Sequence, residues 1–166
     1  MLITDDSWQA VIAAPGFNLG LRCSADEILG IDYLPSGPEQ APRLLLARET
    51  VGQLRAWLKD PAFDFTLPLA PAGTPFQRRV WDQISSIPLG QTRSYGQIAA
   101  LLGSGPRAVG GACGANPYPV VVPCHRVLAA GGGLGGFANA RGGFLLDVKR
   151  WLLRHEGWQI PDQRAG

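Results

Sequence analysis

The residues best suited to chemistry are Cys124 and His125, which follow one another directly after an apolar run that ends at Pro123. A cysteine is nucleophilic as its thiolate, and a neighbouring imidazole or cation favours that form. Because the residue before a proline is restricted to extended geometry, we expect Val122 in a strand-like segment that leads to the cysteine. The alternative is a packing role, since free cysteines are among the most buried residue types. Taken alone, the pair leaves both interpretations open.

The composition fits a soluble globular protein. The chain has 166 residues, of which 46% are hydrophobic and 17% charged, enough for one domain or two small subdomains. Its three cysteines have no paired spacing, and with only two histidines we expect no zinc site, no other metal and no cofactor. The acidic amino terminus predicts no signal peptide, and no apolar run is long enough for a membrane span. We therefore expect a cytoplasmic protein, whose reducing surroundings keep a thiol free.

Charge is distributed unevenly along the chain. Residues 1–73 contain five basic and nine acidic side chains, whereas residues 74–166 contain ten basic and four acidic ones. Arginine supplies nearly all the positive charge of the second part, and its guanidinium suits phosphate geometry. A polyanion-binding surface is therefore expected in the second part, although solvated surface charge also produces such a split.

The first part, residues 1–72, has the pattern of a small mixed α/β subdomain. Residues 17–23 and 28–34 alternate with strand periodicity and predict a hairpin, and residues 43–58 have helical spacing. A further short strand is expected at residues 65–69. No chemistry is evident here, and Cys23 is expected to be a packing residue.

The second part, residues 73–166, predicts several helices with clear starts. Thr74 and Ser94 each precede a glutamine three residues later, the pattern of a capping box, and Pro106 is suited to the first position of a third helix. In the helix that follows Ser94, we expect Ile98, Leu101 and Leu102 to face the core. The short turn at residues 103–105 makes the second and third of these helices a candidate helix-turn-helix.

The third helix is almost without side chains around Gly110 and Gly111. Each glycine inside a helix costs about 1 kcal/mol relative to alanine, so the pair requires a reason. Close packing against another protein helix is one reason, and close approach to a nucleic-acid backbone is the other. The helix offers almost nothing that could read base edges, which favours recognition of a lesion or of DNA shape over recognition of sequence.

The segment from Pro123 to Val127 (Pro-Cys-His-Arg-Val), with Asn116-Pro117 upstream, resembles the acceptor-cysteine motif of the O6-alkylguanine-DNA alkyltransferases. The resemblance runs from about residue 73 to residue 157. It implies an α+β fold in which the N-terminal α/β subdomain packs on a mostly helical, winged-helix-like C-terminal subdomain that carries the helix-turn-helix. It also implies repair of O6-alkylguanine, and of O4-alkylthymine, in duplex DNA by irreversible transfer of the alkyl group to the protein's own cysteine.

The family resemblance assigns the site residues. It makes Cys124 the alkyl acceptor, and it pairs His125 with Glu156 in a relay that removes the thiol proton through a water. Tyr95 helps to rotate the nucleotide and donates a proton towards the base, and Asn116 braces the segment before the cysteine. A core-packing role is the alternative for Tyr95. Glu156 stands in the last turn of a helix predicted over residues 144–155, where a carboxylate opposes the helix dipole, so its position calls for a partner.

The same resemblance predicts the DNA-binding surface. Arg107 would fill the gap left by an extruded nucleotide, although a phosphate contact or a surface ion pair is the simpler interpretation. Phe137 would lie in a loop over the pocket, and the chain departs from the family between Ala138 and Leu146. The full set is Ser94, Arg107, Ala108, Gly110, Gly111, Arg126 and Phe137.

The prediction is thus a monomeric, single-turnover DNA methyltransferase that flips its substrate base and binds no membrane. Three alternatives remain at this point: a cysteine hydrolase, a non-catalytic lesion-binding protein and a sequence-specific regulator. A hydrolase needs a base that converges on its nucleophile across a cleft, and the lesion-binding relatives have tryptophan in place of the cysteine. A regulator needs side chains that read bases, which Gly110 and Gly111 do not provide.

Overall fold

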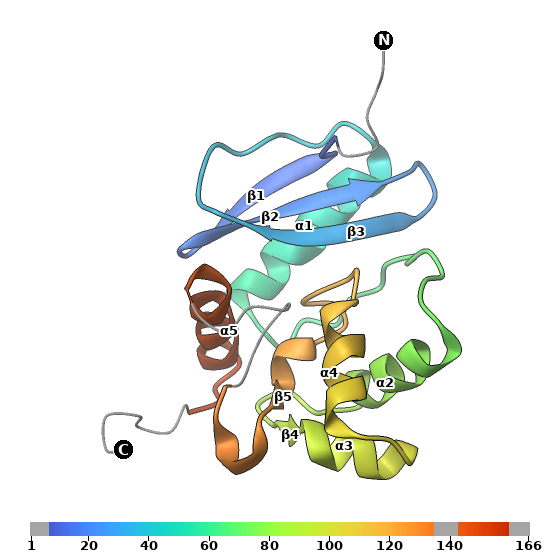
Figure 1. The fold of residues 1–166 in the computed structure, drawn as a ribbon. Helices are drawn as coiled ribbons and strands as arrows, with labels where there is room; N and C mark the ends of the chain where they lie inside the picture. The colour runs from blue at the N-terminus through green and yellow to red at the C-terminus, as the bar shows by residue number, and fades with distance from the viewer. Residues whose placement is uncertain (1–6, 135–142, 160–166) are drawn as a thin grey trace. The chain divides into compact units, whose positions relative to one another are not determined.

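The computed structural model describes residues 7–134 and 143–159, and the chain divides into two compact units, residues 1–71 and 72–166. The division lies one residue before the boundary predicted from the sequence. The architecture is α+β, as predicted (Figure 1). Within the described ranges, no helix combines the length and apolarity needed to cross a membrane.

The first unit is a three-stranded antiparallel sheet with one helix. Strands β1 (Ala10–Ala14), β2 (Phe17–Cys23) and β3 (Ile28–Leu34) pair in that order, and helix α1 (Leu45–Lys59) packs against the sheet (Figure 1). The predicted hairpin and helix are confirmed, whereas β1 was not foreseen because its alanine-rich sequence lacks alternation. The core is apolar; its largest side chains include Phe17, Leu19, Leu21, Ile28, Ile31, Leu54 and Trp57.

The strand expected at residues 65–69 is wrong. Only Leu69 forms a bridge, to Ile28 in β3, because Pro68 cannot donate a backbone hydrogen bond. Thr66 is instead held by the Gln53 side chain, whose Oε1 accepts the Thr66 N–H at 2.9 Å.

The second unit is mostly helical. It contains α2 (Pro75–Ser85), α3 (Tyr95–Leu102), α4 (Pro106–Gly114) and α5 (Phe144–His155), with the short parallel pair β4 (Arg93–Ser94) and β5 (Val127–Leu128). Two 3-10 turns, η1 (Cys124–Arg126) and η2 (Ala130–Gly132), flank β5.

Local sequence signals set the starts of these helices. Both predicted capping boxes are present, with Thr74 and Ser94 each accepting the N–H of the glutamine three residues later. Gly103 ends α3 in the left-handed conformation, and Pro106 opens α4, so the two helices are joined by the short turn predicted from the sequence. The finer expectation of a winged-helix-like arrangement stays a prediction.

One predicted core position in α3 is wrong. Leu101 is 67% exposed, and the buried residues of this helix are Ile98 and Ala99. A helix of eight residues buries only a narrow stripe, and Leu101 lies outside it.

Candidate active site

The segment that presents the cysteine is a turn, so the strand-like geometry expected at Val122 is wrong. The Val122 N–H donates to the Tyr118 carbonyl at 2.8 Å, and Val120 between them has a φ of 74°. A left-handed conformation is strained for a β-branched residue, and such strain persists only where surrounding contacts hold it. Val120 is 4% exposed, so core packing supplies those contacts.

Asn116 holds this turn closed. Its Nδ2 donates to the Val122 carbonyl at 2.9 Å and to the sulfur of Cys124 at 3.3 Å, and its Oδ1 accepts the Tyr118 N–H at 2.9 Å. One amide thereby fixes both ends of the turn and contacts the sulfur atom. These contacts fit the bracing role predicted for Asn116.

Cys124 is 4% exposed and has a second thiol as its neighbour. The hydrogen bond with Cys113 and burial raise the pKa of the Cys124 thiol well above its ordinary value, while Asn116 and Lys149 act in the opposite direction. The structure therefore indicates a resting thiol, and a nucleophilic attack by this sulfur would require the loss of its proton.

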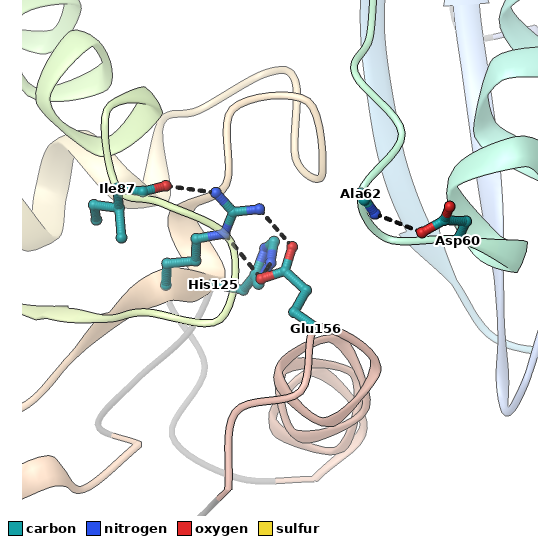
Figure 2. Close-up of polar contacts among 6 residues, drawn as sticks. Asp60, Ala62, Ile87, His125 and Glu156 are labelled. Carbon is teal, nitrogen blue, oxygen red and sulfur yellow. Dashed lines mark hydrogen bonds and ion pairs between the residues drawn. The ribbon is translucent and has the colours of Figure 1, made fainter.

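His125 and Glu156 form a buried pair. The His125 Nε2 lies 2.9 Å from the Glu156 Oε1, and both side chains are almost fully buried (Figure 2). A proton on Nε2 makes this contact favourable and leaves Nδ1 as the basic nitrogen. In the described part of the chain Nδ1 has no hydrogen-bond partner and no hydrogen bond joins His125 to Cys124. A water that bridges Nδ1 and the Cys124 thiol, as the family resemblance implies, stays a prediction.

Arg126 is the second partner of Glu156. Its Nε and Nη2 donate to the two carboxylate oxygens at 2.8 and 2.7 Å, and its Nη1 donates to the Ile87 carbonyl at 2.7 Å. The side chain is only 13% exposed. The sequence analysis expects Arg126 on the DNA-binding surface, whereas in the structure its guanidinium holds the Glu156 carboxylate.

The charges of this cluster follow from its contacts. Burial alone would raise the pKa of Glu156, but hydrogen bonds from Arg126 and His125 outweigh it and lower this pKa to about 2. Burial lowers the pKa of His125, against the opposing effect of Glu156. At neutral pH the carboxylate is therefore ionised and the imidazole is neutral, which is the form that accepts a proton.

Lys149 is a site residue that the sequence analysis missed. It is fully buried in α5, and its Nζ donates to the Val127 and Leu134 carbonyls, each at 2.8 Å. Burial lowers its pKa to about 8, while the nearby thiols of Cys113 and Cys124 act to raise it. The available signal was its spacing, since Lys149 lies three residues from Leu146 and three from Leu152 on the apolar stripe.

Tyr95 opens α3 beside this lysine. Its ring centroid lies 5.9 Å from the Lys149 Nζ, within cation–π range. Burial and the nearby thiols raise the pKa of Tyr95, so the phenol keeps its proton at neutral pH. Tyr95 is half-buried, and both the packing interpretation and the proton-donor interpretation fit this position.

The residues predicted to contact DNA lie at the start and along one side of α4. Arg107 and Ala108 are exposed in its first turn, Gly110 is half-buried and Gly111 is exposed. A Cβ added at either glycine would meet no described atom within 4 Å, so neither glycine is required by a neighbouring helix. Ser94 caps α3, and Phe137 lies outside the described residues.

Residues 75–158 match the family model described as 6-O-methylguanine DNA methyltransferase, DNA binding domain. A methylated-DNA–protein-cysteine methyltransferase of Salmonella typhimurium is 55% identical over 97 residues, which cover 57% of this chain and 54% of that protein. The protein of the same name from Mycobacterium tuberculosis is 41% identical over 131 residues, covering 78% and 76%. This chain therefore spans about half the length of the Salmonella relative and three quarters of the mycobacterial one.

The fold is similar to solved structures as well. The crystal structure of Mycobacterium tuberculosis OGT in complex with DNA superposes with a TM-score of 0.74 at 36% identity, covering 88% of this chain and 90% of that one. The family model, the mycobacterial relative and this structure agree with the motif around Cys124. The chain belongs to the O6-methylguanine DNA methyltransferase family.

Proposed function

We propose that this chain repairs alkylated DNA by moving the alkyl group from O6 of guanine, or O4 of thymine, onto the sulfur of Cys124. The observation that carries the proposal is the surroundings of this sulfur: a buried thiol with an amide donor, a nearby ammonium and a neutral histidine paired with a carboxylate. Every residue used lies in the unit of residues 72–166, to which we assign both DNA binding and transfer.

The transfer is a single in-line displacement. The Cys124 sulfur forms a bond to the alkyl carbon as the bond from carbon to the base oxygen breaks, and the electron pair of that bond passes to the base. The thiol proton passes through a water to Nδ1 of His125, whose positive charge the Glu156 carboxylate stabilises. Tyr95, still protonated, donates towards the leaving base.

Lys149 and Asn116 stabilise the developing charge on sulfur. The pKa of Cys124 is raised overall, but these two residues are the ones that lower it. Lys149 has a fixed place because two backbone carbonyls hold its ammonium. The product is a thioether, a very poor leaving group, so each molecule acts once.

DNA would approach the side of α4 that carries Gly110 and Gly111. The space beside both glycines supports the nucleic-acid explanation of these residues over helix packing. A buried sulfur cannot reach a base inside a duplex, so the base has to be extruded, at a cost of a few kcal/mol. Arg107 is exposed in the first turn of α4, where its side chain could fill the gap that the extruded nucleotide leaves in the base stack.

Incubation with duplex DNA that carries labelled O6-methylguanine tests the proposal. Trypsin cleaves after Arg107 and Arg126, so the label is expected on the peptide of residues 108–126. The amount transferred should not exceed one equivalent of protein. Repeated turnover, or clearance of the lesion without label on this peptide, would refute the mechanism. Hydrolysis of esters or peptides at the same cysteine would favour the hydrolase.

A further inference from the structure

A second thiol lies beside the proposed acceptor. Cys113 is in the last turn of α4, and its thiol is hydrogen-bonded with that of Cys124. Asn116 joins the two segments, because its backbone N–H donates to the Cys113 carbonyl at 3.2 Å while its side chain donates to the Cys124 sulfur at 3.3 Å. The backbone of Cys113 and the sulfur of Cys124 are therefore both held by the residue that closes the turn before Cys124.

The two thiols differ in access. Cys113 is half-buried, whereas Cys124 is 4% exposed. Of the two residues, Cys113 is therefore the more exposed to a small solute. The thiolate is the form of a cysteine that reacts with oxidants, and the Lys149 ammonium, held by the Val127 and Leu134 carbonyls, lies near both thiols.

We propose that Cys113 is a redox modification site that reacts with hydroperoxides and forms a reversible disulfide with Cys124. In the first step the Cys113 thiolate attacks one peroxide oxygen, the O–O bond breaks, and a sulfenic acid and hydroxide form; the hydroxide takes up the proton that the Cys113 thiol released and becomes one water. In the second step the Cys124 sulfur attacks the sulfenic sulfur and displaces hydroxide, which takes up the Cys124 proton. Two thiols and one hydrogen peroxide give one disulfide and two waters, so the thiols lose two electrons and the peroxide gains them.

The disulfide would protect the acceptor. Oxidation of a lone thiol continues to sulfinic and sulfonic acids, which are irreversible, whereas a disulfide returns to two thiols with a dithiol reductant. The thiol chemistry stands apart from alkyl transfer, and only its effect on repair rests on the proposed function. A chain that uses its acceptor once loses all capacity if that sulfur is over-oxidised first.

Peroxide treatment followed by mass analysis tests the proposal. The single tryptic peptide of residues 108–126 carries both thiols, and Cys23 lies on a different peptide and serves as the internal control. We expect the first peptide to lose the mass of two hydrogen atoms and to regain it with dithiothreitol, while the Cys23 peptide is unchanged. Methyl transfer should be lost and restored in parallel. A non-reducing gel should show that the disulfide is intramolecular.

Two variants make the result specific. In Cys124→Ala the sulfenic acid has no partner, so Cys113 should be trapped by dimedone, and wild type should not be. In Cys113→Ala no disulfide forms, so Cys124 should gain two oxygen atoms at high peroxide and its loss of transfer should not reverse. The proposal would be overturned if the wild-type peptide of residues 108–126 kept its mass after peroxide treatment. It would also be overturned if Cys124 were irreversibly oxidised to the same extent with and without Cys113. Transfer by untreated protein is measured separately, so failure of the proposed function is distinguishable.

Discussion

The two units each bury a cysteine in a different environment. Cys23 in β2 is 6% exposed and Cys124 is 4% exposed, so burial alone does not distinguish them. For Cys23 burial is the one cause that raises the thiol pKa. For Cys124 one neighbour, Cys113, and burial raise the thiol pKa, while Asn116 and Lys149 act to lower it.

The same contrast extends to the other buried polar groups. In the first unit these are neutral (Asn18, Thr50 and Gln53), whereas the second unit buries the ionisable His125, Lys149 and Glu156. Burying charge is expensive unless partners are supplied, so such a cluster marks a functional site. The comparison teaches that the chemistry is set by the partners around a thiol and not by its burial.

The largest effect should come from exchanging the two cysteines for alanine. Cys124→Ala is expected to abolish transfer of label from O6-methylguanine DNA, because the acceptor atom is gone. Cys23→Ala should keep full transfer stoichiometry in the folded protein, since its sulfur only fills space in the sheet. Label transfer by Cys124→Ala, or its loss in a folded Cys23→Ala, would break the comparison.

Removing the buried carboxylate should have the next largest effect. Glu156→Ala leaves Arg126 and His125 without their partner, and breaking a buried ion pair costs about 3–5 kcal/mol in the free energy of unfolding. Urea denaturation measures this change. The control is Asp147→Ala in the same unit, which removes the exposed pair with Arg150 and should cost less than about 1 kcal/mol. If Glu156→Ala and Asp147→Ala lowered the free energy of unfolding equally, the buried cluster would contribute no more to stability than the exposed ion pair.

Lys149→Met should slow transfer at neutral pH by about tenfold for each unit by which the pKa of Cys124 rises. The rate of Cys124 alkylation by iodoacetamide, followed against pH, measures this pKa, and a purely structural lysine would leave it unchanged. Lys149→Arg keeps the charge and should restore part of the rate. The neighbouring, more exposed Arg150→Met serves as the control and should leave the pH profile unmoved.

Acid should weaken the fold through Glu156. Its pKa is about 2 in the folded chain against an ordinary 4.5, so its stabilising effect is complete above about 4.5 and is lost as the pH falls towards 2. The free energy of unfolding, measured across this window, should decline with falling pH. Glu156→Gln should decline less steeply, and an equal slope in the variant would remove Glu156 as the cause.

The smallest effect on stability compares glycines in the two units. Gly110→Ala in α4 and Gly52→Ala in α1 each place a methyl group in open space, so each should stabilise the fold by about 1 kcal/mol. Only Gly110→Ala should weaken binding to duplex DNA in a titration, because its methyl group would stand between α4 and the DNA backbone. If both variants bound duplex DNA with equal affinity, the proposal that Gly110 allows close approach of DNA to α4 would be wrong.

Much of the fold was predictable because its signals are local. Capping at Thr74 and Ser94, the turn at Gly103 and the spacing of α5 depend on residues within one helical turn of each other. The turn at residues 116–124 was not predictable, because a side chain, Asn116, and core packing around Val120 override the extended preference before Pro123. Strand β1 forms by pairing with β2, and the sequence of β1 alone contains no pattern that predicts this pairing.

The sequence by itself was enough to predict the proposed acceptor and its class of chemistry, because Cys124, its neighbours and Asn116 are close along the chain. Tertiary structure decided what surrounds the sulfur. Arg126 is turned inward to a carboxylate thirty positions away, Lys149 comes from another helix, and Cys113 becomes a neighbouring thiol only when α4 packs. The physical reason is that the protonation state of a group depends on burial and on charges nearby in space, which local sequence patterns do not specify.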